Sequence, residues 1–274
     1  MIIDSHCHAG KGDGLTGPWD TAAPLHKYLR RAATAGINRT VLFSAFHSNY
    51  DVANRGVARI VASHPNRFYG FAFIHPQRDR GRVFNMVKTA VQQYGFRGIK
   101  VHRYDGRITR EICEVARVFA LPVLYDVMSE VSVVELLSRE YPDVNFIIPH
   151  LGSFADDWRA QLALIDHLVR HHNIYTDTAG IRRFDLLQEA IQRAGPKKVL
   201  FGTDGPWLHP AVELVKVRVL GLPGYEEELV LGGNFLRLTA GVRSHPARYT
   251  LALAAAWTQS EFRDPWSDKN VPAA

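Results

Sequence analysis

Two histidines, His6 and His8, stand one residue apart at the end of the short apolar run that opens the sequence. Side chains alternate along a strand, so His6 and His8 share one face while Cys7 points to the other. A single histidine at a strand end is most often a hydrogen-bonded structural residue, and a single aspartate after a strand is most often a helix N-cap. Here, however, later apolar runs also end in ionisable residues, namely Lys100 with His102, Asp126, His150 and Asp204.

The residue types in this set indicate metal chemistry. Imidazole nitrogens and carboxylate oxygens are the common protein ligands of zinc, and they also suit manganese and iron. A catalytic metal site keeps one position open for water and lowers the pKa of that water to about 7. A nearby carboxylate or imidazole can then take up or return the proton. The set therefore predicts a divalent ion that activates water.

Eight β-rich apolar runs, each followed by a segment with helical periodicity, supply the elements that must position these residues. This alternation predicts an α/β chain with a parallel sheet covered on both faces, and eight units close into a (β/α)8 TIM barrel. The active site of such a barrel lies at the carboxyl ends of its strands, where the ionisable residues stand. The predicted strands are 2–8, 39–46, 67–74, 96–102, 121–127, 145–152, 173–180 and 198–205, and the predicted helices are 22–35, 51–64, 80–94, 109–119, 130–140, 157–171, 183–194 and 209–219.

An open doubly wound sheet is the alternative fold. It is disfavoured because the glycine-rich "HAGKGDGLTG" is not followed promptly by a helix. We expect residues 1–274 to form one domain, with the barrel over about 1–220 and an extra C-terminal helix and irregular tail over 221–274. The tail carries Trp257, Phe262 and Trp266. These rings are costly to leave in water, so we expect the tail to wrap the barrel or a neighbouring subunit.

Composition narrows the function. The net charge of +6 could indicate nucleic-acid binding, but lysine and arginine are spread along the chain, and no basic run is interleaved with aromatic residues. A modest positive field suits small anionic substrates instead. No run of about 18 apolar residues predicts a membrane span. The N-terminus lacks the pattern of a secretory signal, so we expect a cytoplasmic protein, and its two cysteines predict reduced thiols.

Six stretches of the sequence resemble the amidohydrolase superfamily, specifically amidohydrolase family 2. They are "IDSHCHAG", "GFRGIKVHR", "LPVLYDV", "YPDVNFIIPHLGS", "KVLFGTDGPW" and "VLGGNFLRL", and they span residues 2 to about 240. The resemblance implies a TIM barrel with a metal-dependent site. Members of this family are hydrolases, lactonases and non-oxidative decarboxylases that act on small carboxylated or phenolic compounds.

The resemblance also implies roles for single residues. His6 and His8 match the paired metal ligands of the first strand, and Asp204 matches the aspartate of the eighth strand, a ligand and proton shuttle. His150 matches a histidine that either binds metal or orients the attacking water. Asp126 stands where members usually carry a histidine. We expect it to be a fourth ligand, which would favour a harder metal, while the alternative is a weakened or lost metal site.

Lys100 stands where two-metal members use a carboxylated lysine, but many members carry a lysine in "GIK" without that bridge. We therefore expect one ion rather than two, zinc with manganese as the alternative. Lys100, His102, Arg103 and Arg182 are candidates to hold a substrate carboxylate, since arginine binds it bidentately. A surface salt bridge is the alternative role for the arginines. Trp207 is expected to line the pocket.

Together these observations predict a metal-dependent hydrolase of a small ester, lactone or amide that bears a carboxylate, with Asp204 and His150 as catalytic residues. A metal-dependent decarboxylase or hydratase on the same scaffold is the alternative, because fold and metal site would be shared. A non-catalytic barrel that binds a small anion or a protein is a third reading. We expect a small anionic substrate and a homodimer.

Overall fold

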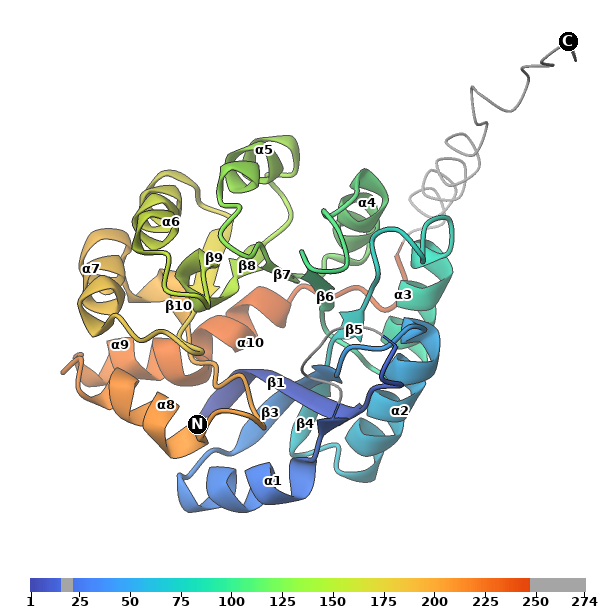
Figure 1. Ribbon diagram of the computed structural model, residues 1–274, viewed down its shortest axis with the longest axis horizontal. Coiled ribbons are helices and arrows are strands. Elements are labelled where there is room, and N and C mark those ends of the chain that lie inside the picture. Colours follow the sequence, from blue (N-terminus) through green and yellow to red (C-terminus); the bar gives the residue numbers. More distant parts are fainter. Residues whose placement is uncertain (16–21, 247–274) are drawn as a thin grey trace, which may run out of the picture.

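The computed structural model describes residues 1–15 and 22–246, in which helices surround a ring of parallel strands (Figure 1). The strands are β1 (Ile3–Lys11), β2 (Ala22–Ala23), β3 (Arg39–Ser44), β4 (Phe68–Gly70), β5 (Ala72–Phe73), β6 (Ile99–His102), β7 (Val123–Asp126), β8 (Phe146–Ile148), β9 (Ile174–Asp177) and β10 (Val199–Leu200). The helices are α1 (Leu25–Thr34), α2 (Tyr50–Ser63), α3 (Val83–Gln92), α4 (Arg110–Phe119), α5 (Ser132–Glu140), α6 (Trp158–Arg170), α7 (Phe184–Ala194), α8 (Pro210–Arg218), α9 (Gly224–Glu228) and α10 (Asn234–Thr239), with short helical turns η1 (Pro149–Gly152), η2 (Pro196–Lys198) and η3 (Leu229–Gly233).

The strands form two sheets, of order β2-β1-β3-β4 and β10-β9-β8-β7-β6-β5. All neighbours pair in parallel except the short β2, which pairs antiparallel with the end of β1. The chain itself joins the sheets where β4 leads into β5. At the other seam, Ser5 N donates to Phe201 O at 2.9 Å and His8 N donates to Gly205 O at 2.7 Å. These hydrogen bonds connect the first barrel strand to the last, as the predicted (β/α)8 barrel requires.

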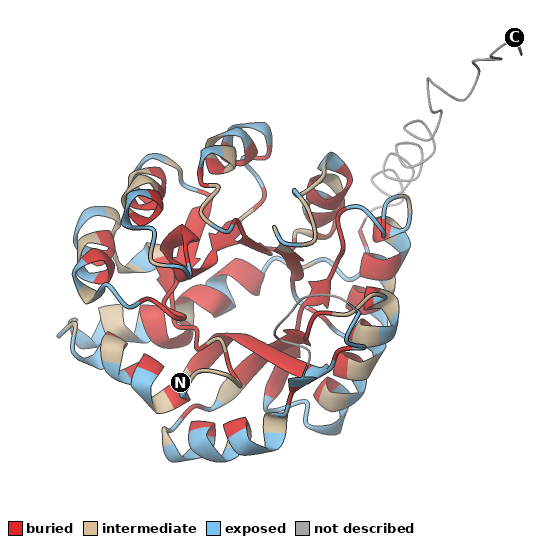
Figure 2. Ribbon diagram, in the orientation of Figure 1, coloured by how far each residue is buried: buried red, intermediate tan, exposed pale blue. Residues whose placement is uncertain are grey.

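Burial explains why these runs form strands. The strands are buried almost throughout, while the helices bury one face and expose the other (Figure 2). A parallel strand covered on both faces needs apolar residues at consecutive positions, which is the pattern of "TVLF" in β3. The TIM-barrel prediction is thus confirmed.

The eight predicted barrel helices are present, within a few residues of their predicted ends. The predicted strands after the first were too long, whereas β1 continues to Lys11, past its predicted end at residue 8. Run 67–74 divides into β4 and β5, and run 145–152 stops at Ile148 because Pro149 has no backbone N–H for the sheet ladder. His150 therefore lies in the turn η1 after β8 rather than in a strand. β10 covers only two residues, so Asp204 lies in the loop that follows it.

The predicted extra C-terminal helix is present as α9, η3 and α10, which pack against the amino ends of the barrel strands. Phe201 N donates to Val230 O at 2.8 Å, and the Asn234 side chain donates to the carbonyls of Pro196 and Val199, each at 2.8 Å. A Cβ at Gly232 would lie only 2.8 Å from Met1 O, so this contact requires glycine. The end of the barrel opposite the candidate site is thereby covered.

None of the helices within residues 1–15 and 22–246 is long and apolar enough to cross a membrane. The predicted packing of Trp257, Phe262 and Trp266 lies outside the described residues.

Candidate metal centre

Two imidazole rings from β1 meet the carboxylate that follows β10. His6 Nε2 lies 3.4 Å from Asp204 Oδ1, and His8 Nε2 lies 3.6 Å from the same oxygen. The three ligand atoms offered by His6, His8 and Asp204 lie within 4.8 Å of one another. The chain thus brings these residues together at the seam where the first and last strands meet.

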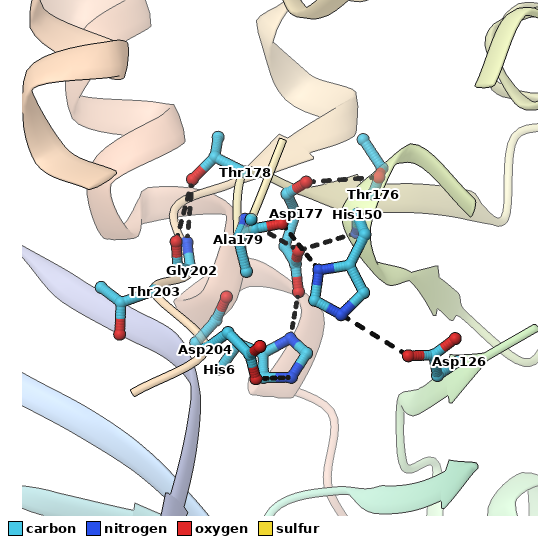
Figure 3. Close-up of polar contacts among 12 residues, drawn as sticks. His6, Asp126, His150, Thr176, Asp177, Thr178, Ala179, Gly202, Thr203 and Asp204 are labelled. Atoms are coloured by element: carbon cyan, nitrogen blue, oxygen red, sulfur yellow. Dashed lines mark hydrogen bonds and ion pairs between the residues drawn. The ribbon is translucent and has the colours of Figure 1, made fainter. Parts of the chain in front are cut away.

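The other ring nitrogen of each histidine is held by a hydrogen bond. His6 Nδ1 lies 2.7 Å from Asp177 Oδ2, and His8 Nδ1 lies 3.0 Å from the Ser44 carbonyl oxygen. A carbonyl can only accept, so His8 carries its proton on Nδ1 and presents the Nε2 lone pair toward Asp204. In Figure 3 His6 lies between Asp177 and Asp204. Hydrogen bonds of this kind orient metal-binding histidines.

Burial also keeps these imidazoles neutral, as metal ligands must be. Burial lowers the pKa of His6, although the Asp177 charge opposes the change. Burial lowers the pKa of His8 well below its usual value, and the positive charge of Lys100 acts in the same direction. Two neutral, oriented nitrogens and one carboxylate with an open side fit a divalent ion such as zinc or manganese.

Asp126 has different neighbours. Its Oδ2 lies 3.2 Å from His102 Nε2 and 3.5 Å from His150 Nε2, and its Oδ1 accepts from Met128 N at 2.9 Å. The Tyr104 N–H donates to His102 Nδ1 at 3.0 Å, so the neutral ring carries its proton on Nε2 and donates to Asp126. The predicted role of Asp126 as a fourth metal ligand stays a prediction.

His150 stands between Asp126 and the three converging residues. Its Nδ1 lies 2.6 Å from the Ala179 carbonyl oxygen, so that nitrogen carries a proton, and its Nε2 points toward Asp126 (Figure 3). Burial alone would lower the pKa of His150, but the hydrogen bond and charge of Asp126 outweigh it and raise the pKa to about 9. Burial would raise the pKa of Asp126, but its contacts with His102, and to a smaller extent with His150, hold it well below its usual value.

Two site residues adopt a backbone conformation that L-residues rarely adopt. His150 has φ 59° and Asp204 has φ 52°. A non-glycine residue at positive φ costs of order 1–3 kcal/mol, and such residues concentrate at functional sites. Asp177, a residue that we did not predict, supports His150 by accepting its backbone N–H at 3.2 Å.

A cavity of about 490 Å³ opens over these residues. Lys100 is fully buried in its wall, with Nζ 5.0 Å from the centre of the Phe43 ring. The Trp207 ring lies 4.7 Å from the His8 ring, as its predicted place in the pocket requires. The remaining lining residues combine apolar and small polar side chains, which are Met128, Ser129, Ser153, Phe154, Ala155 and Leu208.

The two predicted arginines are not among the lining residues of this cavity. The Arg103 guanidinium donates to Glu130, which also pairs with Arg107, and Arg182 lies 3.1 Å from Asp156. Both arginines therefore form salt bridges, the alternative role that the sequence left open. The cations that line the cavity come from lysine and histidine instead.

A family model described as Amidohydrolase matches residues 3–238. No curated protein sequence matches the chain. The chain is similar to 2,6-dihydroxybenzoate decarboxylase from Rhizobium (17% identity, TM-score 0.69), with 87% of this chain and 98% of that chain covered. It is also similar to a manganese-bound dihydroxybenzoic acid decarboxylase from Polaromonas (18%, TM-score 0.65, 87% and 96% covered) and to a probable 2-pyrone-4,6-dicarboxylic acid hydrolase from Acinetobacter baumannii (15%, TM-score 0.65, 87% and 99% covered).

Proposed function

Since the chain belongs to the amidohydrolase family, we propose that it is a metal-dependent hydrolase whose ion is held by His6, His8 and Asp204. The convergence of two oriented imidazole nitrogens on one carboxylate oxygen inside a cavity supports this proposal. The family uses divalent metal ions, and one similar structure contains manganese. We propose one zinc ion per chain, with manganese as the alternative.

A divalent ion bound there would supply Lewis acidity, which makes water easier to deprotonate and polarises a carbonyl group. Asp204 Oδ1 faces both histidines, which leaves Oδ2 to accept a proton from the attacking water. His150, protonated through its contact with Asp126, can stabilise the developing oxyanion and return a proton to the leaving group. Asp204 and His150 are thus the proposed catalytic residues.

The proposed substrate is a small ester, lactone or amide that bears a carboxylate. Lys100 and His150 line the cavity together with His102, and the first two place positive charge beside the ion site. Phe154 and Trp207 supply apolar walls that suit a flat ring. The amine of Lys100 attracts an anion as a point charge, without the paired geometry of an arginine.

Metal analysis and isotope labelling test this proposal. Protein purified without chelators should contain about one divalent ion per chain, and His8→Ala should contain almost none. His26→Ala, in an exposed part of α1, is the matched control. In isotopically labelled water, hydrolysis of carboxylated lactones and esters should put solvent oxygen into the new carboxylate. A protein that binds no divalent ion, or whose turnover persists in His8→Ala, would refute the proposal.

Decarboxylation is the second candidate, because the similar structures include decarboxylases of dihydroxybenzoic acids. In that reaction the ion and the cationic groups would hold the substrate, and His150 would protonate the ring carbon that loses carbon dioxide. Release of carbon dioxide from hydroxybenzoates, without uptake of solvent oxygen, would favour it over hydrolysis. The homodimer and the cytoplasmic location remain predictions.

A further inference from the structure

Helix α8, with its C-cap residue Val219, carries an apolar stripe on its outer surface. Val212, Val215 and Val219 follow one another at spacings of three and four residues, so they lie on one face. They are 60%, 55% and 61% exposed, while Leu214 and Val217 on the opposite face are buried against the barrel. No other helix of the described chain, 1–15 and 22–246, carries three large exposed apolar residues.

The charged residues of α8 leave this valine stripe uncovered because they are engaged elsewhere. Lys216 Nζ lies 2.5 Å from Glu213 and donates to the Thr178 and Ile181 carbonyls. Arg218 lies 2.8 Å from Glu227 on α9. A helix that is apolar on both faces is normally buried on both faces. The outer face of α8 therefore has the character of an interface.

The flanks of the stripe carry opposite charge. Helix α1 packs beside α8 and exposes Lys27, Arg30 and Arg31, for which no ion pair exists within the described residues. On the other side, α9 contributes the consecutive acids Glu226, Glu227 and Glu228. Figure 1 shows α8 between these two helices. The surface thus runs from basic through apolar to acidic.

We propose that this surface is the contact between two copies of the chain, related by a two-fold axis that runs along α8. A two-fold contact brings a surface against itself, so the surface must be its own complement. With the axis along α8, the two stripes meet and the basic α1 of each copy faces the acidic α9 of its partner. An axis across α8 would bring like charges together. The proposal does not depend on the reaction that the site catalyses.

Analytical ultracentrifugation of the full chain over a wide range of concentration tests the contact. The wild type should be a dimer. Val215→Lys should weaken dimerisation by at least about 100-fold, because each change occurs twice across the axis and each costs about tenfold. Val169→Lys, at an exposed valine of α6, is the matched control and should leave the dimer intact. Circular dichroism confirms that each variant is folded, and Val212→Lys replaces any that is not.

Charge reversal tests the direction of the axis. Changing Lys27, Arg30 and Arg31 together to Glu should weaken the dimer, and adding Glu226→Arg with Glu228→Arg should restore it. A dimer unaffected by these reversals would overturn the proposed axis. A wild-type monomer at all concentrations would overturn the contact itself. The proposed contact would also be overturned if the dimer survived Val215→Lys but was lost when Trp257 and Trp266 were changed to Ser in the full chain.

Discussion

At the scale of single residues, the two nitrogens of each metal-site imidazole have separate tasks. One nitrogen of His6 faces Asp204, and the other is fixed by Asp177. The hydrogen bond to Asp177 decides which nitrogen can bind a metal ion, because a proton held on Nδ1 leaves the lone pair of Nε2 free. Asp177 should therefore matter to metal binding although it is not among the three converging ligands.

Replacing Asp177 by Asn tests this coupling. Oδ1 of Asp177 accepts the backbone N–H groups of His150 and Ala179, at 3.2 Å and 3.1 Å, so the amide NH2 of Asn would have to face His6 Nδ1. His6 would then carry its proton on Nε2 and lose its ligand atom. Zinc affinity, measured by competition with a chelating dye, should fall about 10- to 100-fold. Asp166→Asn, at a half-exposed residue of α6, should leave zinc affinity unchanged.

Asp126→Asn separates two roles for that residue. If Asp126 mainly holds His102 and His150, as its contacts favour, metal content should stay unchanged and zinc affinity should fall by less than about threefold. The visible absorption spectrum of the cobalt-substituted protein, which reports the ligands of the ion, should also be preserved. A loss of affinity above about tenfold with an altered spectrum would instead make Asp126 the fourth ligand.

The sequence indicated part of the residue network and missed the rest for physical reasons. The rule that ionisable residues at strand ends face the site also points to Asp177, which ends β9, so that residue could have been found. The carbonyls of Ser44 and Ala179 carry no signal in residue type. The partners of Arg103 and Arg182 come from other loops, whose approach depends on tertiary structure.

At the scale of elements, the close packing of the segment after β10 against β1 and β9 positions the site. A Cβ at Gly202 would lie 3.0 Å from His6 Cβ and 3.2 Å from Asp177 Cγ, both anchored in strands. Gly202→Ala should displace His6 and Asp177. Zinc affinity should then fall at least about tenfold, because the hydrogen bond between these two side chains orients His6. Gly56→Ala on α2, where a Cβ meets nothing within 4 Å, is the control. It should preserve affinity and stabilise the fold by up to about 1 kcal/mol. Equal affinity in the two variants would contradict this role.

Lys198 joins the turn η2 to the end of α6 and makes stability depend on pH. Its Nζ donates to the carbonyls of His171, His172 and Ile174. Burial, with the nearby charge of Arg237, lowers the pKa of Lys198 to about 8. Because this value is below that of the unfolded chain, the charged amine destabilises the fold below about pH 8 and the penalty disappears as the pH rises.

The free energy of unfolding of the wild type, relative to Lys198→Met, should therefore increase between about pH 7 and pH 9.5. The hydrogen bonds that Lys198→Met loses change the difference in free energy of unfolding by a constant amount. They do not alter the sign of its dependence on pH. Urea unfolding at several pH values measures the difference. A difference that falls with rising pH would mean that the carbonyl oxygens keep the amine charged.

Elements were easier to predict than their ends. Helices α1 to α8 follow from apolar periodicity and from stop signals such as Gly195 after α7. The strand ends at Pro149 and after Leu200 were missed because apolar residues continue past the sheet into buried turns. Such residues look the same in the sequence whether they pair in a sheet or pack in a loop.

At the scale of the whole molecule, metal binding should stabilise the fold. An ion that binds only the folded chain adds about 2.7 kcal/mol at a free concentration 100 times its dissociation constant. For a domain of this size we expect the melting temperature to rise by about 5 to 10 °C on zinc addition and to fall on chelation. Differential scanning fluorimetry of the wild type and His8→Ala measures this, and an equal rise in both would place the ion elsewhere.

The closure of the barrel has a consequence for how the protein matures. The two histidines belong to its first strand, and Asp204 follows its last. The three proposed ligands are therefore far apart in the order of synthesis, although their ligand atoms lie within 4.8 Å of one another. A growing chain on the ribosome carries the histidine pair of β1 long before it carries the carboxylate, which follows the last barrel strand. The ion would then be taken up as the ring is completed, and its loading would mark a finished molecule.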